Sequence, residues 1–278
     1  MPNTIRAEHT TTLISRIGLI FIGFTAGLAS SSLGIGGGLI LMPAFLFLFR
    51  YTPSMAAGTS LATMVPMAAI GLTTHYLLQG SNIQWQTVFL LTIGSLLGAR
   101  YGSYVAAYLN KRMFSILFSL LLIFTSLQFT GIISFSQVIA VKQAASILLP
   151  AIGMFAGICS ALFGIGGGII TVPLLSLMFG FSIHEAIATS LAVILPTTLA
   201  GALFHHKFKN INEKGLIFLI PASLFGAMIG AVMAINLPAD LLKTAFSILL
   251  ILCAGKLIYG LDIKSMPSTI IKNMRISP

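Results

Sequence analysis

The sequence predicts an all-α polytopic membrane protein made of two five-segment repeats, with glycine-rich breaks at membrane depth. Of its 278 residues, 57% are hydrophobic and 7% are charged, whereas about a quarter of the residues of soluble domains are charged. Apolar stretches of about 20 residues, the length of a helix that crosses about 30 Å of hydrocarbon, recur along the whole chain. Many residues of the first half return in the second. These observations favour membrane-spanning helices over the short alternating strands of a barrel.

Ten apolar segments divide the chain into two groups of five, and each segment predicts a helix. We expect a polar N-terminal tail over 1–12, a first repeat over 13–133, a linker over 134–140, a second repeat over 141–260 and a basic C-terminal tail over 261–278. The segments of the first repeat are 13–32, 38–50, 54–79, 86–108 and 113–133. Those of the second repeat are 141–162, 167–180, 184–206, 214–235 and 241–260.

Two copies of one glycine run mark the repeat. Gly34-Ile35-Gly36-Gly37-Gly38 returns 130 residues later as Gly164-Ile165-Gly166-Gly167-Gly168. The same offset relates further identical residues, which are Gly23 and Gly153, Gly27 and Gly157, Pro43 and Pro173, Thr59-Ser60-Leu61-Ala62 and Thr189-Ser190-Leu191-Ala192, Pro66 and Pro196, and His75 and His205. So many identities at one offset indicate an internal duplication. Because five crossings is an odd number, we expect the second repeat to be inverted relative to the first.

Basic residues in the connections predict the orientation. A ten-crossing arrangement with a cytoplasmic N-terminus puts most Lys and Arg residues, among them Arg50, Lys111 and Arg112, on the cytoplasmic side, as the positive-inside rule requires. The C-terminus is then cytoplasmic too. In the alternative, segments 38–50 and 167–180 dip into the membrane without crossing it, which gives eight crossings and moves these three residues outside. The charges favour ten crossings.

The glycine runs are the strongest candidates for a binding site. Glycine reaches backbone angles closed to other residues and lets another group approach the main chain. In hydrocarbon, irregular backbone is found only where protein or a water-filled cavity satisfies its polar groups. N–H groups at the start of the next helix then form an anion-binding concavity. The alternative is close helix packing through small residues, but three adjacent glycines exceed what packing needs. The predicted binding residues are Gly34, Gly36, Gly37, Gly38, Gly164, Gly166, Gly167 and Gly168.

Two Thr-Ser pairs extend this candidate site. Thr59 with Ser60, and Thr189 with Ser190, lie within long apolar segments. Their hydroxyls can donate to an anion or to carbonyl groups of their own helix. Because the pairs are duplicated beside a duplicated glycine run, we interpret them as binding residues.

Three ionisable residues within or near the ends of apolar segments are further candidates. Arg100 is placed within a crossing, where it is either a counter-ion for the anion or a side chain that snorkels to the interface. His75 and His205 are related by the repeat. They are candidates for a proton relay, because imidazole titrates near neutral pH, and the alternative is a structural role.

Composition argues against several other function classes. The net charge of +10 comes from residues scattered singly between apolar segments, not clustered as on a surface that binds nucleic acid. Cys159 and Cys253 provide neither a disulfide framework nor a zinc site. No Ser/His/Asp, metal-ligand or paired-carboxylate arrangement is present, so we expect no enzyme, no metal and no cofactor. The expected partners are a small anionic substrate, the lipid bilayer and a coupling ion. The sequence does not specify an oligomeric state.

The duplicated glycine run, the proline that follows it, the Thr-Ser-Leu-Ala segment and the histidine near the end of that segment resemble the TauE/SafE sulfite exporter family. The resemblance covers about residues 15–260. It implies a carrier in the inner membrane of a bacterium or archaeon that moves small anions such as sulfite, sulfoacetate or related sulfonates. The glycine positions and the two Thr-Ser pairs match the family pattern. The chain departs from it at Ala188, where glycine is frequent, and at Asn82 and Asn212, where an acidic residue is common.

The sequence therefore predicts a secondary transporter that moves a small anion by alternating access between its repeats. One alternative is an anion channel that uses the same donors. The other is a membrane enzyme or an assembly subunit.

Overall fold

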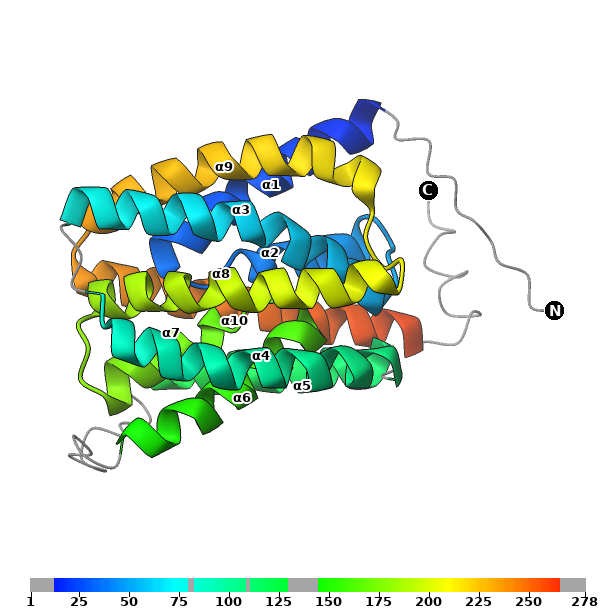
Figure 1. Ribbon diagram of the computed structural model, residues 1–278. Helices are drawn as coiled ribbons and strands as arrows, with labels where there is room; N and C mark the ends of the chain where they lie inside the picture. Colours follow the sequence, from blue (N-terminus) through cyan, green and yellow to red (C-terminus); the bar gives the residue numbers. More distant parts are fainter. Residues whose placement is uncertain (1–12, 80–82, 109–110, 130–144, 266–278) are drawn as a thin grey trace.

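Ten helices make up the part of the chain that the structure describes, which is residues 13–79, 83–108, 111–129 and 145–265 of a computed structural model (Figure 1). No strand is found among these residues. The helices of the first half are α1 (Leu13–Leu33), α2 (Gly38–Phe47), α3 (Pro53–Gln79), α4 (Trp85–Tyr108) and α5 (Lys111–Phe129). Those of the second half are α6 (Ala145–Phe163), α7 (Gly168–Met178), α8 (Ile183–Lys207), α9 (Glu213–Asn236) and α10 (Ala239–Ser265).

Each predicted apolar segment corresponds to one of these helices, with shifts of a few residues at the ends. Helix α2 ends at Phe47, before the predicted boundary, because Arg50 adopts a left-handed backbone with φ of 55° and the Tyr51 N–H donates to the Phe45 carbonyl at 2.9 Å. Helix α7 ends in the same way, with φ of 68° at Gly180. A left-handed residue followed by such a bond stops a helix. The predicted tail 1–12 and linker 134–140 lie outside the described residues, as does most of 261–278.

Side chains fix the starts of α8 and α9. The Ser182 hydroxyl accepts from the N–H of Glu185, and the Glu185 carboxylate accepts from the N–H of Ser182, which is a reciprocal capping box. At α9, the Asn212 side chain accepts from the N–H of Gly215 at 3.1 Å. These caps satisfy N–H groups that the first turn of a helix leaves without a partner.

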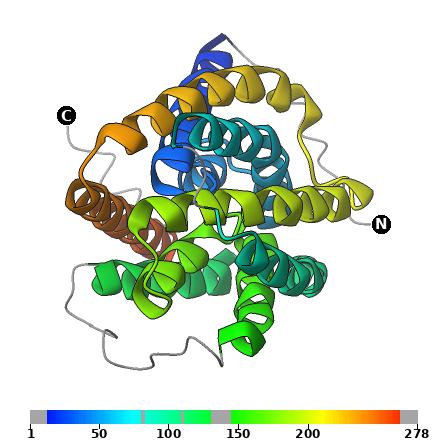
Figure 2. The ribbon, with the colours of Figure 1, turned by 60° about the vertical axis from the view of Figure 1, so that its left-hand side comes forward.

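The helices pack in pairs that exchange partners between the two halves. Helix α1 packs along α9, and α6 packs along α4. Helices α3 and α8 contact one another, and both views show them between the α1–α9 pair and the α4–α6 pair (Figures 1 and 2). Helix α5 packs along α10. The first and second halves are therefore interleaved rather than side by side.

Glycines bring the paired helices close together. A side chain added at Gly98 or Gly102 of α4 would overlap the backbone of α6 at Met154 or Ile158. In the other pair, Gly27 of α1 lies in the same way against Ser223 of α9. Small residues four apart allow such close approach between helices in a membrane.

Within the described residues, five helices, in whole or in part, are long and apolar enough to cross a membrane, and they are α1, α3, α4, α8 and α9. The start of α1, the end of α10 and the α2–α3 and α8–α9 connections lie at one end of the bundle (Figure 1). We call this the basic end, because it carries Arg16, Arg50, Lys207, Lys209 and Lys214. The opposite end carries the starts of α8 and α10, with Glu185 and Asp240.

The close approach of α4 and α6 generates a prediction for Gly98→Ala. The new Cβ would overlap the Met154 carbonyl oxygen, and overpacking of this kind costs about 1 to 3 kcal/mol. We expect a lower midpoint of thermal unfolding in detergent, followed by circular dichroism. Gly255→Ala on α10 is the control, because no described atom outside the adjacent residues and the backbone of its own helix lies within 4 Å of an added Cβ. Equal midpoints for the two variants would contradict the packing described for α4 and α6.

Candidate functional site

The two glycine runs lie against each other in the interior. Gly38 at the start of α2 is so close to the backbone of Gly164 and Ile165 that a side chain has no room. Gly168 at the start of α7 stands in the same relation to the backbone of Gly34 and Ile35. Two segments that are far apart in the sequence therefore meet at one place, and each leaves no room for a side chain on the glycine that faces it.

The backbone of both runs has the same unusual conformation. The φ angles are 68°, 82° and 74° at Gly34, Gly36 and Gly37, and 63°, 76° and 78° at Gly164, Gly166 and Gly167. These positive angles are open to glycine and strained for other residues. The runs are therefore true breaks between α1 and α2 and between α6 and α7, as the sequence predicts.

Two buried serines hold the runs together across the halves. The Ser60 hydroxyl on α3 donates to the Gly164 carbonyl at 2.7 Å, and the Ser190 hydroxyl on α8 donates to the Gly34 carbonyl at 2.8 Å. Both serines are fully buried. Ser190 also lies 2.9 Å from the Thr171 hydroxyl on α7. Each half thus donates a hydrogen bond to a carbonyl group in the glycine run of the other half.

The N–H groups of the runs are differently placed from the carbonyls. The Gly37 carbonyl accepts from the N–H groups of Ile40 and Leu41, and the Gly167 carbonyl accepts from those of Ile170 and Thr171, at 3.0 to 3.1 Å. No hydrogen-bond partner within the described part of the chain is found for the N–H groups of Gly36 and Gly37 or of Gly166 and Gly167. These donors lie at the N-termini of α2 and α7, where the helix dipole is positive.

The two threonines next to these serines have different surroundings. The Thr59 hydroxyl accepts from the N–H of Asn212 at 3.0 Å, and the side-chain amide of Asn212 donates to the Tyr51 hydroxyl. Burial raises the pKa of Tyr51 by more than the Asn212 bond lowers it. The Thr189 hydroxyl is fully buried, and no partner is found for it among the described residues.

His75 and His205 occupy equivalent positions on α3 and α8. The Nε2 atom of His75 lies 3.0 Å from the Ser31 carbonyl, and that of His205 lies 3.4 Å from the Ala161 carbonyl. Because a carbonyl only accepts, Nε2 must carry the proton in both rings. Both carbonyls belong to the last turns before the glycine runs. Their role in a proton relay stays a prediction.

Among the described residues, no contact joins Arg100 to the glycine runs. Its side chain lies on an exposed face of α4, whereas the runs and the Thr-Ser pairs are buried. The groups nearest to the runs come from other helices, mainly α3 and α8, with Ala26 of α1 and Ala156 of α6 also close. The structure therefore assembles the predicted glycines, Ser60 and Ser190 into one site, with Arg100 apart from it.

Among the residues that sequence reasoning missed at this site are Met64 on α3 and Ile194 on α8. The methyl group of Met64 is the nearest atom in the direction that a side chain would take from Gly36, and also from Gly166. Ile194 lies next to both glycines as well. Each of the two follows a site serine by four residues, the spacing that puts two side chains on one face of a helix.

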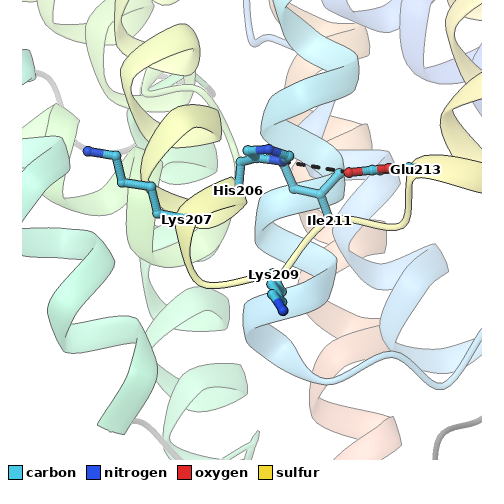
Figure 3. A pocket seen from close by; sticks show the side chains of 5 residues that line it. All are labelled: His206, Lys207, Lys209, Ile211 and Glu213. Atoms are coloured by element: carbon cyan, nitrogen blue, oxygen red, sulfur yellow. Dashed lines mark ion pairs between the residues drawn. The ribbon is translucent and has the colours of Figure 1, made fainter.

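A surface pocket lies at the basic end, in the α8–α9 connection (Figure 3). It has a volume of about 460 Å³ and is lined by His206, Lys207, Lys209, Ile211 and Glu213. His206 Nδ1 lies 3.7 Å from Glu213 Oε1, while Lys207 and Lys209 point away from this pair (Figure 3). The lysines do not converge on one point, so the pocket does not form a compact anion site.

Comparison with known proteins places this architecture in a family. The family described as sulfite exporter TauE/SafE matches residues 19–257, which include both glycine runs and all the site residues described above. The chain belongs to the TauE/SafE family. It is therefore a membrane transporter by family.

Curated relatives of this TauE/SafE protein carry the same general description. A probable membrane transporter protein of Bacillus subtilis, YunE, is 29% identical over 266 residues, which cover 87% of this chain and 96% of the relative. A probable membrane transporter protein of Methanocaldococcus jannaschii is 29% identical over 210 residues, covering 73% and 75%. Another, from Haemophilus influenzae, is 26% identical over 254 residues, covering 84% and 95%. No solved structure matches the chain significantly.

The serine bonds of this TauE/SafE site generate a prediction for Ser60→Ala and Ser190→Ala. Each change leaves a buried carbonyl without its donor, which costs about 1 to 3 kcal/mol. We expect a lower midpoint of thermal unfolding for both variants. Ser103→Ala is the matched control, because the Ser103 hydroxyl is buried and its only bond within the described residues is to the Ala99 carbonyl of its own helix. A similar decrease of the unfolding midpoint in all three variants would argue against a special role for the bonds between the halves.

Proposed function

We propose that this protein is a secondary transporter that moves a small anion across the inner membrane by alternating access. Sulfite, a sulfonate or a related organosulfur or organic anion is the proposed cargo, in keeping with the family description. One observation carries the proposal: two sets of backbone N–H groups, without partners among the described residues, lie together at the starts of α2 and α7. Such N–H groups bind anions.

The proposed site holds charge without a fixed cation at its centre. Each helix N-terminus contributes a partial positive charge of about half an elementary charge. An anion between the starts of α2 and α7 would be attracted by both dipoles and by the N–H groups themselves. Because no full positive charge is buried there, the anion can also leave, as a carrier requires.

The way the helices pair supports alternating access. Two inverted repeats would form the equivalent pairs α1–α9 and α4–α6, and movement of one pair with its neighbours against the other would alternate access. The Ser60 and Ser190 bonds run between the two halves. When the glycine runs move apart at one side, these bonds break and their hydroxyls become donors for the anion. The Thr189 hydroxyl is a further proposed donor.

The proposed orientation puts the basic end in the cytoplasm. Arg16, Arg50, Lys207, Lys209 and Lys214 belong to helix ends and connections at this end, and Lys and Arg are enriched in cytoplasmic connections. Both ends of the chain would then face the cytoplasm. His75 and His205 remain the proposed relay if transport is coupled to protons, with Arg100 as a proposed electrostatic guide on α4.

The experiment that tests this function is uptake into proteoliposomes. Sulfite, thiosulfate, sulfoacetate and simple carboxylates would be supplied with and without a pH gradient. A carrier shows saturable uptake and exchange of internal for external anion, whereas a channel shows single-channel current without exchange. Uptake of none of these anions, or chemical change of the anion instead of movement, would overturn the proposal.

The backbone site generates a prediction for Gly167→Ala. This glycine has φ of 78° at the start of α7, and an added side chain would distort the proposed anion site. We expect anion uptake to fall at least about tenfold, the change produced by a barrier about 1.4 kcal/mol higher.

Gly180→Ala is the matched control for this prediction. Gly180 also has a positive φ, 68°, but it lies in the α7–α8 connection, where no described atom beyond its two chain neighbours lies within 4 Å of an added Cβ. Both variants carry similar backbone strain, and only Gly167 lies in the glycine run. Equal uptake by the two variants would remove the run from the mechanism.

A further inference from the structure

An apolar plug fills the place where the two glycine runs meet. The Met64 side chain is fully buried, and its methyl group lies against both Gly36 and Gly166. Ile194, its counterpart in the second repeat, is also fully buried and lies beside the same two glycines. The N–H donors of the two runs are thus next to hydrocarbon side chains in this conformation.

The two plug residues differ in their freedom to move. Met64 is unbranched, with three rotatable bonds and a polarisable sulfur. Ile194 is β-branched and has one strongly preferred rotamer in a helix. The Ser60 hydroxyl, which donates to the Gly164 carbonyl, also lies 3.6 Å from the Met64 sulfur. Met64 is therefore the movable member of the pair, and it touches the same serine that joins the halves.

We propose that the Met64 side chain is the central gate of the transport path. This inference rests on the proposed function and names the residue that closes its site. In the present conformation the methyl group fills the space between Gly36 and Gly166 and blocks passage. When the thioether rotates away from the runs, Ile194 stays in place, and a small anion gains access to the N–H groups.

The proposed gate also excludes ions other than the cargo. With the thioether in place, an ion that crosses must lose its water and pass through hydrocarbon, which is strongly unfavourable. Cargo that bonds to the N–H groups of both runs recovers part of that cost. Shortening the Met64 side chain should therefore open a leak that does not depend on the identity of the cargo.

The test is passive leak of nitrate from proteoliposomes that contain purified protein, measured together with uptake of sulfite. Met64→Ala is expected to raise nitrate leak at least about tenfold over the unmodified protein. Met64→Leu, which conserves most of the volume, is expected to leave the leak unchanged. Met42→Ala on α2 is the control, because Met42 is also fully buried but is not among the atoms nearest to the glycine runs. Size-exclusion profiles would verify that each variant is folded.

The outcomes separate the gate from the transport function. A leak through Met64→Ala alone supports the gate, even if the unmodified protein carries no sulfite. Absence of a leak in folded Met64→Ala overturns the gate, even if the unmodified protein carries sulfite well. An equal leak through Met64→Ala and Met42→Ala also overturns it, because any buried cavity would then have the same effect.

Discussion

The structure depends on how the polar backbone groups of interrupted helices find hydrogen-bond partners inside a membrane bundle. Each half interrupts its helices with a glycine run, and each run has carbonyl and N–H groups that hydrocarbon cannot satisfy. The carbonyl groups of Gly34 and Gly164 are satisfied by serines of the opposite half. The N–H groups point to no protein partner within the described residues. This difference between acceptors and donors is what makes the site suited to an anion.

The surrounding helices make that arrangement possible. Close packing of α1 on α9 and of α4 on α6, through glycines such as Gly27 and Gly98, ties the two halves together on both sides. Helices α3 and α8 then cross the centre with Ser60 and Ser190 facing the runs. Any relative motion of the halves must change the serine bonds, so the contacts that stabilise the site are also those that a transport cycle would rearrange.

Much of this architecture could be predicted from the sequence. Composition and segment length predicted the helices, and the repeated glycines predicted both breaks, because positive φ angles at three of the five positions of each run leave few alternatives to glycine. Helix ends such as Phe47 were less predictable, since they depend on the left-handed turn at Arg50 rather than on hydropathy. The family resemblance was confirmed by the match over residues 19–257.

The internal arrangement of the site could not be predicted in the same way. The Ser60–Gly164 bond joins residues 104 positions apart, and no local pattern specifies such a pairing. No sequence pattern indicated Met64, because nothing distinguishes it from the other apolar residues of an apolar helix. Nor did the sequence predict that the Arg100 side chain is exposed. In a chain with so few charged residues, the sequence hardly distinguishes the faces of α4 that meet lipid from those that meet protein.

The most direct test of the central claim is solid-state NMR of protein labelled with ¹⁵N-glycine in lipid, recorded during a titration with sulfite. The amide signals of Gly36, Gly37, Gly166 and Gly167 should shift together and saturate, while those of Gly94 and Gly98 in the α4–α6 contact should not move. Saturable sulfite uptake without any shift at the glycine runs would show that the anion binds elsewhere and would contradict the account.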